Sequence, residues 1–329
     1  MKKCFLLILL AIALLLNFQS CFTTSEIVQV DYSVITVPEE GAFVYQKITD
    51  ETIENVAHPI VKKDKNKEHI TFTAVNLLCF NPDGKSLFYI GFSNNQSNCF
   101  EKSVENKGVV TQRTFRSSLQ DICLSPDGKA LCFSEAMGDY KYLYLSKFAS
   151  GAVIQQLSSQ NVVDRHPRYT VDGNKIFFDR AGMIWSYDLT NGALNSYGRG
   201  YQPYPINNNE FICYRESTNR GEIWLVNYET GKESILQSMD GRWFITPTVS
   251  PDGKWVLCAA NSIPKGNLNE ENIDIYVFRT DGTQLTQLTY HTGNDICPIW
   301  SPDGKQIYFL SQRGTEKGAY NIWKMDFNL

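Results

Sequence analysis

Ser301-Pro302-Asp303-Gly304-Lys305 is one copy of a five-residue turn motif that recurs along this chain of 329 residues. Clear copies also begin at Asn81, Ser125 and Ser250, and degraded copies begin at Thr170 and Pro205. Proline fixes φ near the value that the second position of a type I turn needs, aspartate suits the next position, and glycine takes the positive φ that closes the turn. Each copy therefore predicts a tight turn.

Apolar segments flank the turn motif on both sides. The segments that follow it include Leu87-Phe88-Tyr89, Leu131-Cys132-Phe133 and Ile307-Tyr308-Phe309. The segments that precede it include Leu77 to Phe80 and Ile296 to Trp300. Short apolar runs bounded by turn residues are typical of buried β-strands, so each copy joins two strands.

The rest of each repeat predicts two further strands. A third apolar segment recurs as Ile184-Trp185-Ser186-Tyr187 or Ile322-Trp323-Lys324-Met325, and a glycine turn and a fourth segment usually follow. No helical period of useful length is present. A strand-only repeat of roughly forty residues indicates a β-propeller with one blade per repeat. The sequence therefore predicts an all-β fold, a six-bladed β-propeller over residues 41–329.

The last repeat lacks its fourth strand, because the sequence stops at Leu329 directly after the third. Residues 41–49 resemble residues 282–289, which hold a fourth strand. We expect an N-terminal strand of about residues 42–49 to complete the last blade. This pairing would close the ring and cover an edge that would otherwise be open.

The N-terminus has the features of a bacterial lipoprotein signal. Lys2 and Lys3 precede an apolar run from Phe5 to Leu16, which is too short to span a bilayer and fits a signal-peptide core. Cys21 follows the run, with the small residue Ser20 before it. We expect a signal peptide at residues 1–20, lipidation of Cys21 and a tether at residues 21–40. The alternative is ordinary secretion with an incidental cysteine.

Composition excludes nucleic acid as the natural partner. The formal net charge is −4, and 43% of the residues are hydrophobic, which is ample for a large core. The one basic run, Lys62 to Lys67, is interrupted by an acid, and we interpret it as a solvated loop.

The repeats resemble those of the TolB-type propeller family, on the pattern Trp300 to Lys305 followed by a strand and an Ile-Tyr or Ile-Trp strand. The resemblance covers about Gly41 to Leu329. TolB is a periplasmic protein of the Tol–Pal envelope system with an α/β domain before its propeller, and the residues before Gly41 are too few for that domain. The resemblance implies an envelope propeller that binds something. Similar repeats form the propellers of prolyl-oligopeptidase-type peptidases and of oligogalacturonate lyase.

Candidate binding residues fall in segments that join the fourth strand of one blade to the first strand of the next. Loops on a rigid scaffold commonly carry binding groups, and Arg, Tyr and Trp suit protein hot spots or sugar stacking. The candidates are Arg165, His166, Tyr204, Arg242, Trp243 and Asp295. For Arg242 and Trp243 we keep open the alternative that they pack between blades.

A metal site is the alternative use of the same loops. His58, His166 and His291 would lie on one face and could hold a divalent metal, as in the resemblance to oligogalacturonate lyase. That arrangement would favour a metal-assisted enzyme acting on polysaccharide. Serine-hydrolase chemistry is disfavoured, since no Gly-x-Ser-x-Gly elbow occurs.

Two frequent residue types have structural explanations. The aspartate of the turn motif has a sufficient conformational role, so the turns are the least expected place for function. Seven of the nine cysteines lie beyond Cys21, mostly at strand positions, and we interpret them as small buried hydrophobes rather than disulfides.

Together these features predict a non-catalytic envelope lipoprotein without a cofactor, in the periplasm or at the cell surface, anchored by lipid to the outer membrane. Its propeller would bind an envelope protein or a glycan. The alternatives are the metal-assisted polysaccharide-active enzyme and a structural part of an envelope assembly.

Overall fold

A computed structural model describes residues 43–49, 61–63, 70–72, 77–94, 96–104, 110–148, 153–218, 220–262, 272–314 and 319–328. The expected signal peptide, the tether, Cys21 and His58 lie outside the described residues.

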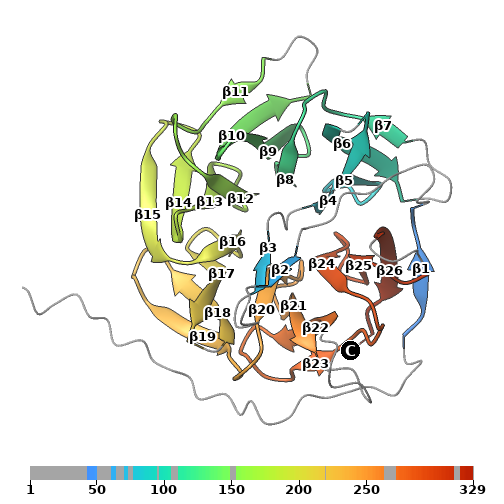
Figure 1. The fold of residues 1–329 in the computed structure, drawn as a ribbon. Helices are drawn as coiled ribbons and strands as arrows, with labels where there is room; N and C mark the ends of the chain where they lie inside the picture. The colour runs from blue at the N-terminus through green and yellow to red at the C-terminus, as the bar shows by residue number, and fades with distance from the viewer. Residues whose placement is uncertain are drawn as a thin grey trace, which may run out of the picture.

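Six four-stranded antiparallel sheets are arranged in a ring, with the first strand of each sheet innermost (Figure 1). Blade 1 comprises β4 (Leu78–Phe80), β5 (Ser86–Ser93), β6 (Gln96–Ser103) and β7 (Val110–Gln112). Blade 2 comprises β8 (Leu119–Leu124), β9 (Ala130–Met137), β10 (Tyr140–Lys147) and β11 (Gln155–Gln156). Blade 3 comprises β12 (Asp164–Tyr169), β13 (Lys175–Arg180), β14 (Met183–Asp188) and β15 (Leu194–Arg199).

The second half of the ring repeats this plan. Blade 4 comprises β16 (Tyr201–Pro205), β17 (Glu210–Ser217), β18 (Arg220–Asn227) and β19 (Glu233–Gln237). Blade 5 comprises β20 (Phe244–Val249), β21 (Trp255–Ser262), β22 (Asn272–Arg279) and β23 (Thr286–Gln287). Blade 6 comprises β24 (Asp295–Trp300), β25 (Gln306–Ser311), β26 (Asn321–Asp326) and the N-terminal β1 (Tyr45–Lys47). The six-bladed propeller is confirmed.

Strand β1 closes the ring as expected. It pairs antiparallel with β26, with Tyr45 opposite Met325 and Lys47 opposite Trp323. The N–H of Ile48 donates to the carbonyl of Ile322 over 2.8 Å and extends the ladder by one bond. The outer edge of the last blade is therefore covered by the start of the propeller sequence.

The turn motif folds as its residues predict. In the last copy, Ser301 Oγ donates to Asp303 Oδ1 over 2.6 Å and accepts from the N–H of Gln306 over 2.9 Å, while Gly304 takes a φ of 70°. The same serine–aspartate bond recurs between Ser250 and Asp252. The aspartate thus has the local conformational role expected of it.

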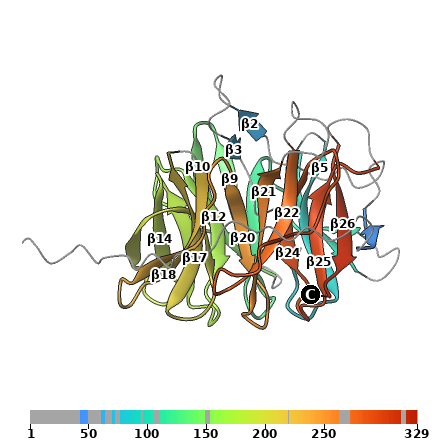
Figure 2. The same cartoon turned by 90° about the horizontal axis from the view of Figure 1, so that it is seen from below.

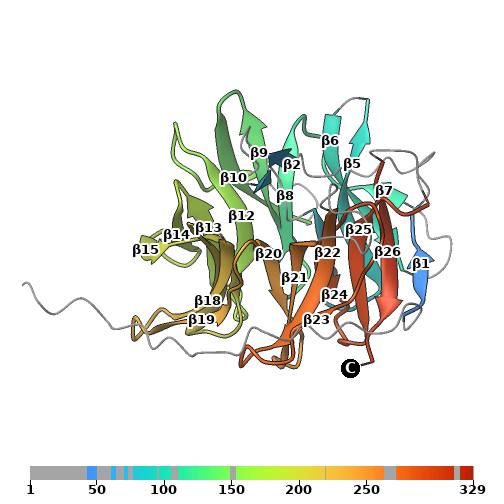
Figure 3. The same cartoon turned by 60° about the horizontal axis from the view of Figure 1, so that its bottom comes forward.

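The turns define one end of the ring, here called the turn face, and the opposite end is the loop face. Figure 2 shows the C-terminus at the turn face and the hairpin of β2 (Val61–Lys63) and β3 (Ile70–Phe72) beyond the loop face. Figures 1 and 3 place this hairpin close to the ring axis. The expectation of a plain solvated loop was therefore wrong for Lys62 and Lys63, which lie in β2.

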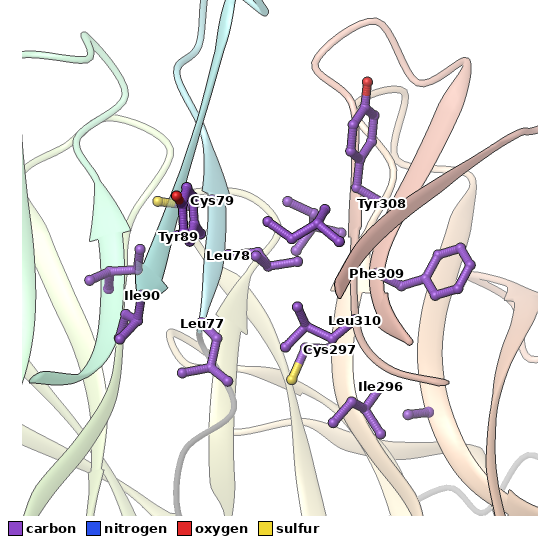
Figure 4. Packing of buried hydrophobic residues seen from close by; sticks show 14 of the residues in the cluster. Leu77, Leu78, Cys79, Tyr89, Ile90, Ile296, Cys297, Tyr308, Phe309 and Leu310 are labelled. Carbon is purple, nitrogen blue, oxygen red and sulfur yellow. The ribbon is translucent and has the colours of Figure 1, made fainter. Parts of the chain in front are cut away.

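Apolar side chains fill the space between neighbouring blades. Figure 4 shows Leu78 of blade 1 near Leu310 of blade 6, and both belong to one buried cluster that also includes Tyr89 and Tyr308. All seven described cysteines are buried and free, which confirms their interpretation as core residues. The described residues contain no helix, and hence none that could cross a bilayer.

Candidate functional site

Irregularities in the innermost strands shape the ring near the loop face. A bulge places a non-glycine residue at positive φ directly before a proline in four blades, at His166, Gln202, Thr246 and Cys297. A bulge bends its strand and leaves backbone groups without their ladder partners. At three of these bulges, a side chain of the preceding blade accepts a hydrogen bond from the backbone N–H.

Three hydrogen bonds link the bulges around the ring. The N–H of Gln202 donates to Asp179 Oδ2 over 3.1 Å, and the N–H of Thr246 donates to Gln202 Oε1 over 2.7 Å. The N–H of His166 donates to Asp121 Oδ2 over 3.4 Å. Polar side chains at this level therefore join one blade to the next.

His166 and Arg165 meet the same buried carboxylate. His166 Nδ1 hydrogen-bonds Asp179 Oδ2, and Arg165 Nε lies 3.4 Å from Asp179 Oδ1 as an ion pair. The other ring nitrogen of His166, Nε2, is buried and has no hydrogen-bond partner among the described residues. Burial lowers the pKa of nearby Lys141, whereas Asp121 and Asp179 act in the opposite direction. Blade 3 thus holds a compact ionic cluster in which His166 Nε2 and Arg165 Nε have no hydrogen-bond partner among the described residues.

Asp295 contributes to the contacts that close the ring. It is fully buried, and Arg313 Nη2 donates to its Oδ2 over 2.6 Å. Burial raises the pKa of Asp295, and the Arg313 guanidinium opposes that rise. The same guanidinium lies 3.9 Å from the ring centroid of Tyr45 in the closing strand. Asp295 therefore holds an arginine that packs on β1.

Arg242 and Trp243 pack between blades 4 and 5, the alternative that the sequence left open. Arg242 Nη1 donates to the carbonyl of Asn261 over 2.7 Å and stands 5.2 Å from the Tyr276 ring. Trp243 is 8% exposed. Its Cα would lie 3.1 Å from a Cβ added to Gly221, so only glycine allows this close approach of the two blades.

Tyr204 lies in β16 rather than in a loop. It lines a cavity of about 300 Å³ on the ring axis, at the turn end, to which the innermost strands of all six blades contribute. The guanidinium of Arg168 stands 5.5 Å from its ring. Arg168 was not among the sequence candidates.

The sequence candidates do not form one site. The expectation that they all lie in loops was wrong for Arg165, His166, Tyr204 and Asp295, which belong to innermost strands. Arg165 and His166 lie together, and the others are spread over blades 4, 5 and 6.

His166 and His291, the two members of the predicted metal set that the structure describes, lie apart in the ring. His291 Nδ1 accepts from the N–H of Gly293 over 2.9 Å, in the connection between blades 5 and 6, whereas His166 belongs to blade 3. In the part of the chain that the structure describes, no three His, Cys, Asp or Glu side chains are grouped to hold a metal ion.

The loop face exposes apolar side chains that the sequence analysis did not identify. Phe92 is 41% exposed, Phe115 83%, Met137 52% and Tyr140 40%. We call these four residues the apolar patch. Their positions at hairpin tips and in a polar loop could have identified them, because core packing does not require apolar side chains there.

Backbone bonds bring the segments of the apolar patch together. The N–H of Ser97 donates to the carbonyl of Ser117, and the N–H of Ala136 donates to that of Ser118. Phe92 is the strand partner of Ser97, and Met137 follows Ala136 and pairs with Tyr140. The loop that carries Phe115 therefore lies between the tips of blades 1 and 2. A group of exposed apolar side chains is typical of an interaction surface.

Comparison with known proteins identifies the repeats. Over 66 residues the chain is 35% identical to dipeptidyl-peptidase 5 of Porphyromonas gingivalis, which is 20% of this chain and 10% of that protein. The structure of TolB from Acinetobacter baumannii has a TM-score of 0.54 at 20% identity and covers 74% of this chain and 65% of that one.

The same fold occurs in oligogalacturonate lyase from Vibrio parahaemolyticus, with a TM-score of 0.55 at 13% identity, over 90% of this chain and 96% of that one. At these identities the likeness concerns the fold alone. The family described as TolB beta propeller domain matches residues 42–268 and 207–328. The chain belongs to the TolB beta propeller domain family.

Proposed function

We propose that this protein is a non-catalytic binding protein of the bacterial envelope, and that its loop face docks a protein partner through the apolar patch. The observation that carries the proposal is the exposure of Phe92, Phe115, Met137 and Tyr140 on adjoining segments of blades 1 and 2. Aromatic residues and methionine are enriched in the buried centres of protein interfaces.

The ionisable side chains near the patch favour binding over chemistry. Arg116 pairs with Glu135, and Asp164 accepts from Arg180 over 2.6 and 2.8 Å. Such pairs stabilise the scaffold, and Ser158 Oγ also donates to Asp164 over 2.5 Å. A rigid face with apolar side chains suits docking.

The envelope location rests on the sequence and on the family. The apolar run from Phe5 to Leu16 and Cys21 support export and lipidation, with the outer membrane as the expected anchor site. The matching family takes its description from TolB, and a binding role is what the resemblance to TolB implies. A glycan remains the alternative ligand, and an envelope assembly the alternative setting.

A single atom supports the alternative of a metal-assisted enzyme. The buried Nε2 of His166 lacks a partner among the described residues and could accept a ligand or an ion. The remaining described residues supply no set of ligands around it, so we derive no reaction step from it.

Site-specific photocrosslinking tests the proposal. A photoreactive phenylalanine analogue placed at Phe115 in the producing bacterium is expected to give one discrete adduct. The same analogue at Val153, 86% exposed on the blade 2 segment next to β11, is the matched control and is expected to give none. Equal patterns at the two positions, or no adduct at Phe115, would contradict the proposal.

A further inference from the structure

The cavity of about 300 Å³ on the ring axis, here called the axial cavity, has mainly apolar walls. Leu78 of blade 1, Val249 of blade 5 and Ile299 of blade 6 are among its lining residues. Val171, in the turn of blade 3, also lines it and is 58% exposed, so the cavity opens at the turn face. Its volume is at the lower end of the range of natural ligand pockets. The axial cavity therefore suits a small molecule with an apolar part.

Arg168 supplies the charge of the axial cavity. It is the one charged side chain among the described residues of the lining, and no aspartate or glutamate belongs to that described set. Arg168 makes other contacts, including the cation–π contact with Tyr204, but a guanidinium has five N–H donors and can bind a further acceptor. Burial raises the pKa of Tyr204, and the Arg168 guanidinium opposes that rise. The positive potential of Arg168 therefore extends to the wall of the cavity.

The aspartates of the turn motifs lie near the mouth of the axial cavity but are balanced by lysines. Asp127 and Asp252 each follow a proline of the lining and are not part of the lining themselves. Lys129 Nζ lies 3.9 Å from Asp127 Oδ2, and Lys254 Nζ lies 3.5 Å from Asp252 Oδ2. In every turn motif that has an aspartate, a lysine follows two or three residues later. The mouth is therefore close to neutral, and Arg168 sets the charge inside.

A second, smaller cavity adjoins the axial cavity at the level of the bulges. Its volume is about 10 Å³, which is room for about one water molecule, and Arg168, Thr248 and Ile299 line both cavities. Thr246 lines the smaller cavity and is 8% exposed, and its hydroxyl is buried without a hydrogen-bond partner among the described residues. Leaving a buried hydroxyl without a partner costs free energy. An acceptor oxygen in this space would be a partner for Thr246 and for Arg168.

We propose that the axial cavity binds a small monocarboxylic acid, with the carboxylate at Arg168 and Thr246 and the tail among the apolar walls. A carboxylate can accept two parallel N–H bonds from a guanidinium and has lone pairs left for a hydroxyl. Apolar walls disfavour phosphate and sulfate, because oxygens on every side of these ions would lose their hydration. The axial cavity lies at the opposite end of the ring from the apolar patch, so this inference is independent of the proposed function.

Isothermal titration calorimetry of the purified protein with hexanoate tests the proposal. We expect saturable binding of one hexanoate per chain. Methyl hexanoate is the matched uncharged ligand and should bind at least about tenfold more weakly, because it cannot form the ion pair with Arg168. Butyrate should bind about fifteenfold more weakly than hexanoate, since each buried CH₂ contributes roughly a factor of four.

The variant Thr246→Val separates a binding role from a structural one. It removes the hydroxyl and keeps the shape of the side chain. Hexanoate binding should weaken several-fold, whereas the melting temperature of the protein without ligand should stay the same or rise, because the hydroxyl has no described partner to lose. Arg168→Gln should abolish the preference for hexanoate over its methyl ester.

A pair of variants at the mouth covers the case in which Arg168→Gln disturbs folding. Val171→Glu places a negative charge at an exposed position of the lining, and Val171→Gln is its uncharged counterpart of similar shape. Val171→Glu should bind hexanoate several-fold more weakly than Val171→Gln, with a smaller difference at high salt. Phe115→Ser, at the loop face, should leave hexanoate binding unchanged.

Four results would overturn the proposal. The first is no saturable binding of hexanoate, and the second is equal binding of hexanoate and its methyl ester. The third is unchanged hexanoate affinity in both Thr246→Val and Val171→Glu, which would place the acid elsewhere. The fourth is displacement of hexanoate by an equal concentration of chloride or phosphate, which would indicate a general anion site. Each of these results leaves the crosslinking test at Phe115 unaffected, so the two proposals can fail separately.

Discussion

The hydroxyl of Thr49 donates a hydrogen bond to the side-chain oxygen of Asn321 over 2.8 Å, although the two residues are 272 positions apart in the chain. Thr49 Oγ1 also accepts from the N–H of Ile322 over 2.8 Å. The same arrangement recurs within blade 1, where Thr114 accepts from the N–H of Cys99 and donates to Asn98. The closing strand thus ends with the polar contact that ends ordinary fourth strands.

Replacing Thr49 by valine should destabilise the propeller by about 1–3 kcal/mol, because Asn321 and the N–H of Ile322 would lose a buried partner. Urea unfolding of the purified propeller measures this change. Thr218→Val, at an exposed position, is the control and should be close to neutral. An unchanged unfolding midpoint for Thr49→Val would show that this contact does not stabilise the closure.

Arg242→Ala and Trp243→Ala should both lower stability, because both side chains pack between blades 4 and 5. The expected loss for the buried tryptophan is about 3–5 kcal/mol. Thermal unfolding measures it, with Lys232→Ala at an exposed site as the control. Normal melting of Trp243→Ala would return this residue to the candidate binding groups.

The propeller could be predicted because its signals are local. Each turn motif fixes its own φ values, and the flanking strands alternate within a few residues of it. The closing strand was recognisable because Thr49 repeats the end of a fourth strand, as Thr289 does. None of these inferences needed a contact between distant residues.

The candidate site could not be predicted in the same way, because its partners are distant in sequence. His166 was expected in a loop that joins two blades, but a bulge keeps it in β12, where it meets Asp179. Asp295 is held by Arg313, and Arg242 by the carbonyl of Asn261. Only the folded structure shows that these side chains are partners in hydrogen bonds and ion pairs.

The thiols should be unreactive in the folded protein. Burial raises the pKa of Cys79 to about 12 and that of Cys213 to about 11, so almost no thiolate exists near pH 8. A chain that begins after Cys21 should show no reaction with a thiol reagent until denaturant is added, and then seven reactive groups. Fast labelling of the native chain would indicate an opening of the blades.

Removal of metal should leave the protein unchanged. His291 Nδ1 is engaged with Gly293, and the described residues place no three ligands together. We expect less than one equivalent of transition metal in the purified protein and the same melting temperature with and without EDTA. One tightly held equivalent that disappears in His166→Gln would instead support the metal-assisted alternative.

Low pH should reduce the stability of the propeller by protonating the aspartates of its turns. Hydrogen bonds from Thr170, Ser250 and Ser301 lower the pKa values of Asp172, Asp252 and Asp303 below the usual range. A carboxyl whose pKa is lower in the folded state stabilises the fold above the pKa of the unfolded chain, which is about 3.9. This contribution is lost as the pH falls through the folded-state pKa.

The serine partners make the acid effect testable. Ser250→Ala and Ser301→Ala should return the two pKa values toward normal, so the stability difference from the natural sequence should be largest near pH 6 and should shrink toward pH 2. A constant part should remain at every pH, because the N–H groups of Trp255 and Gln306 also lose their acceptor. Urea unfolding across this pH range measures both parts, with Ser196→Ala at an exposed strand position as the control. A difference that did not change with pH would mean that the hydroxyls stabilise the turns without acting on the carboxylates.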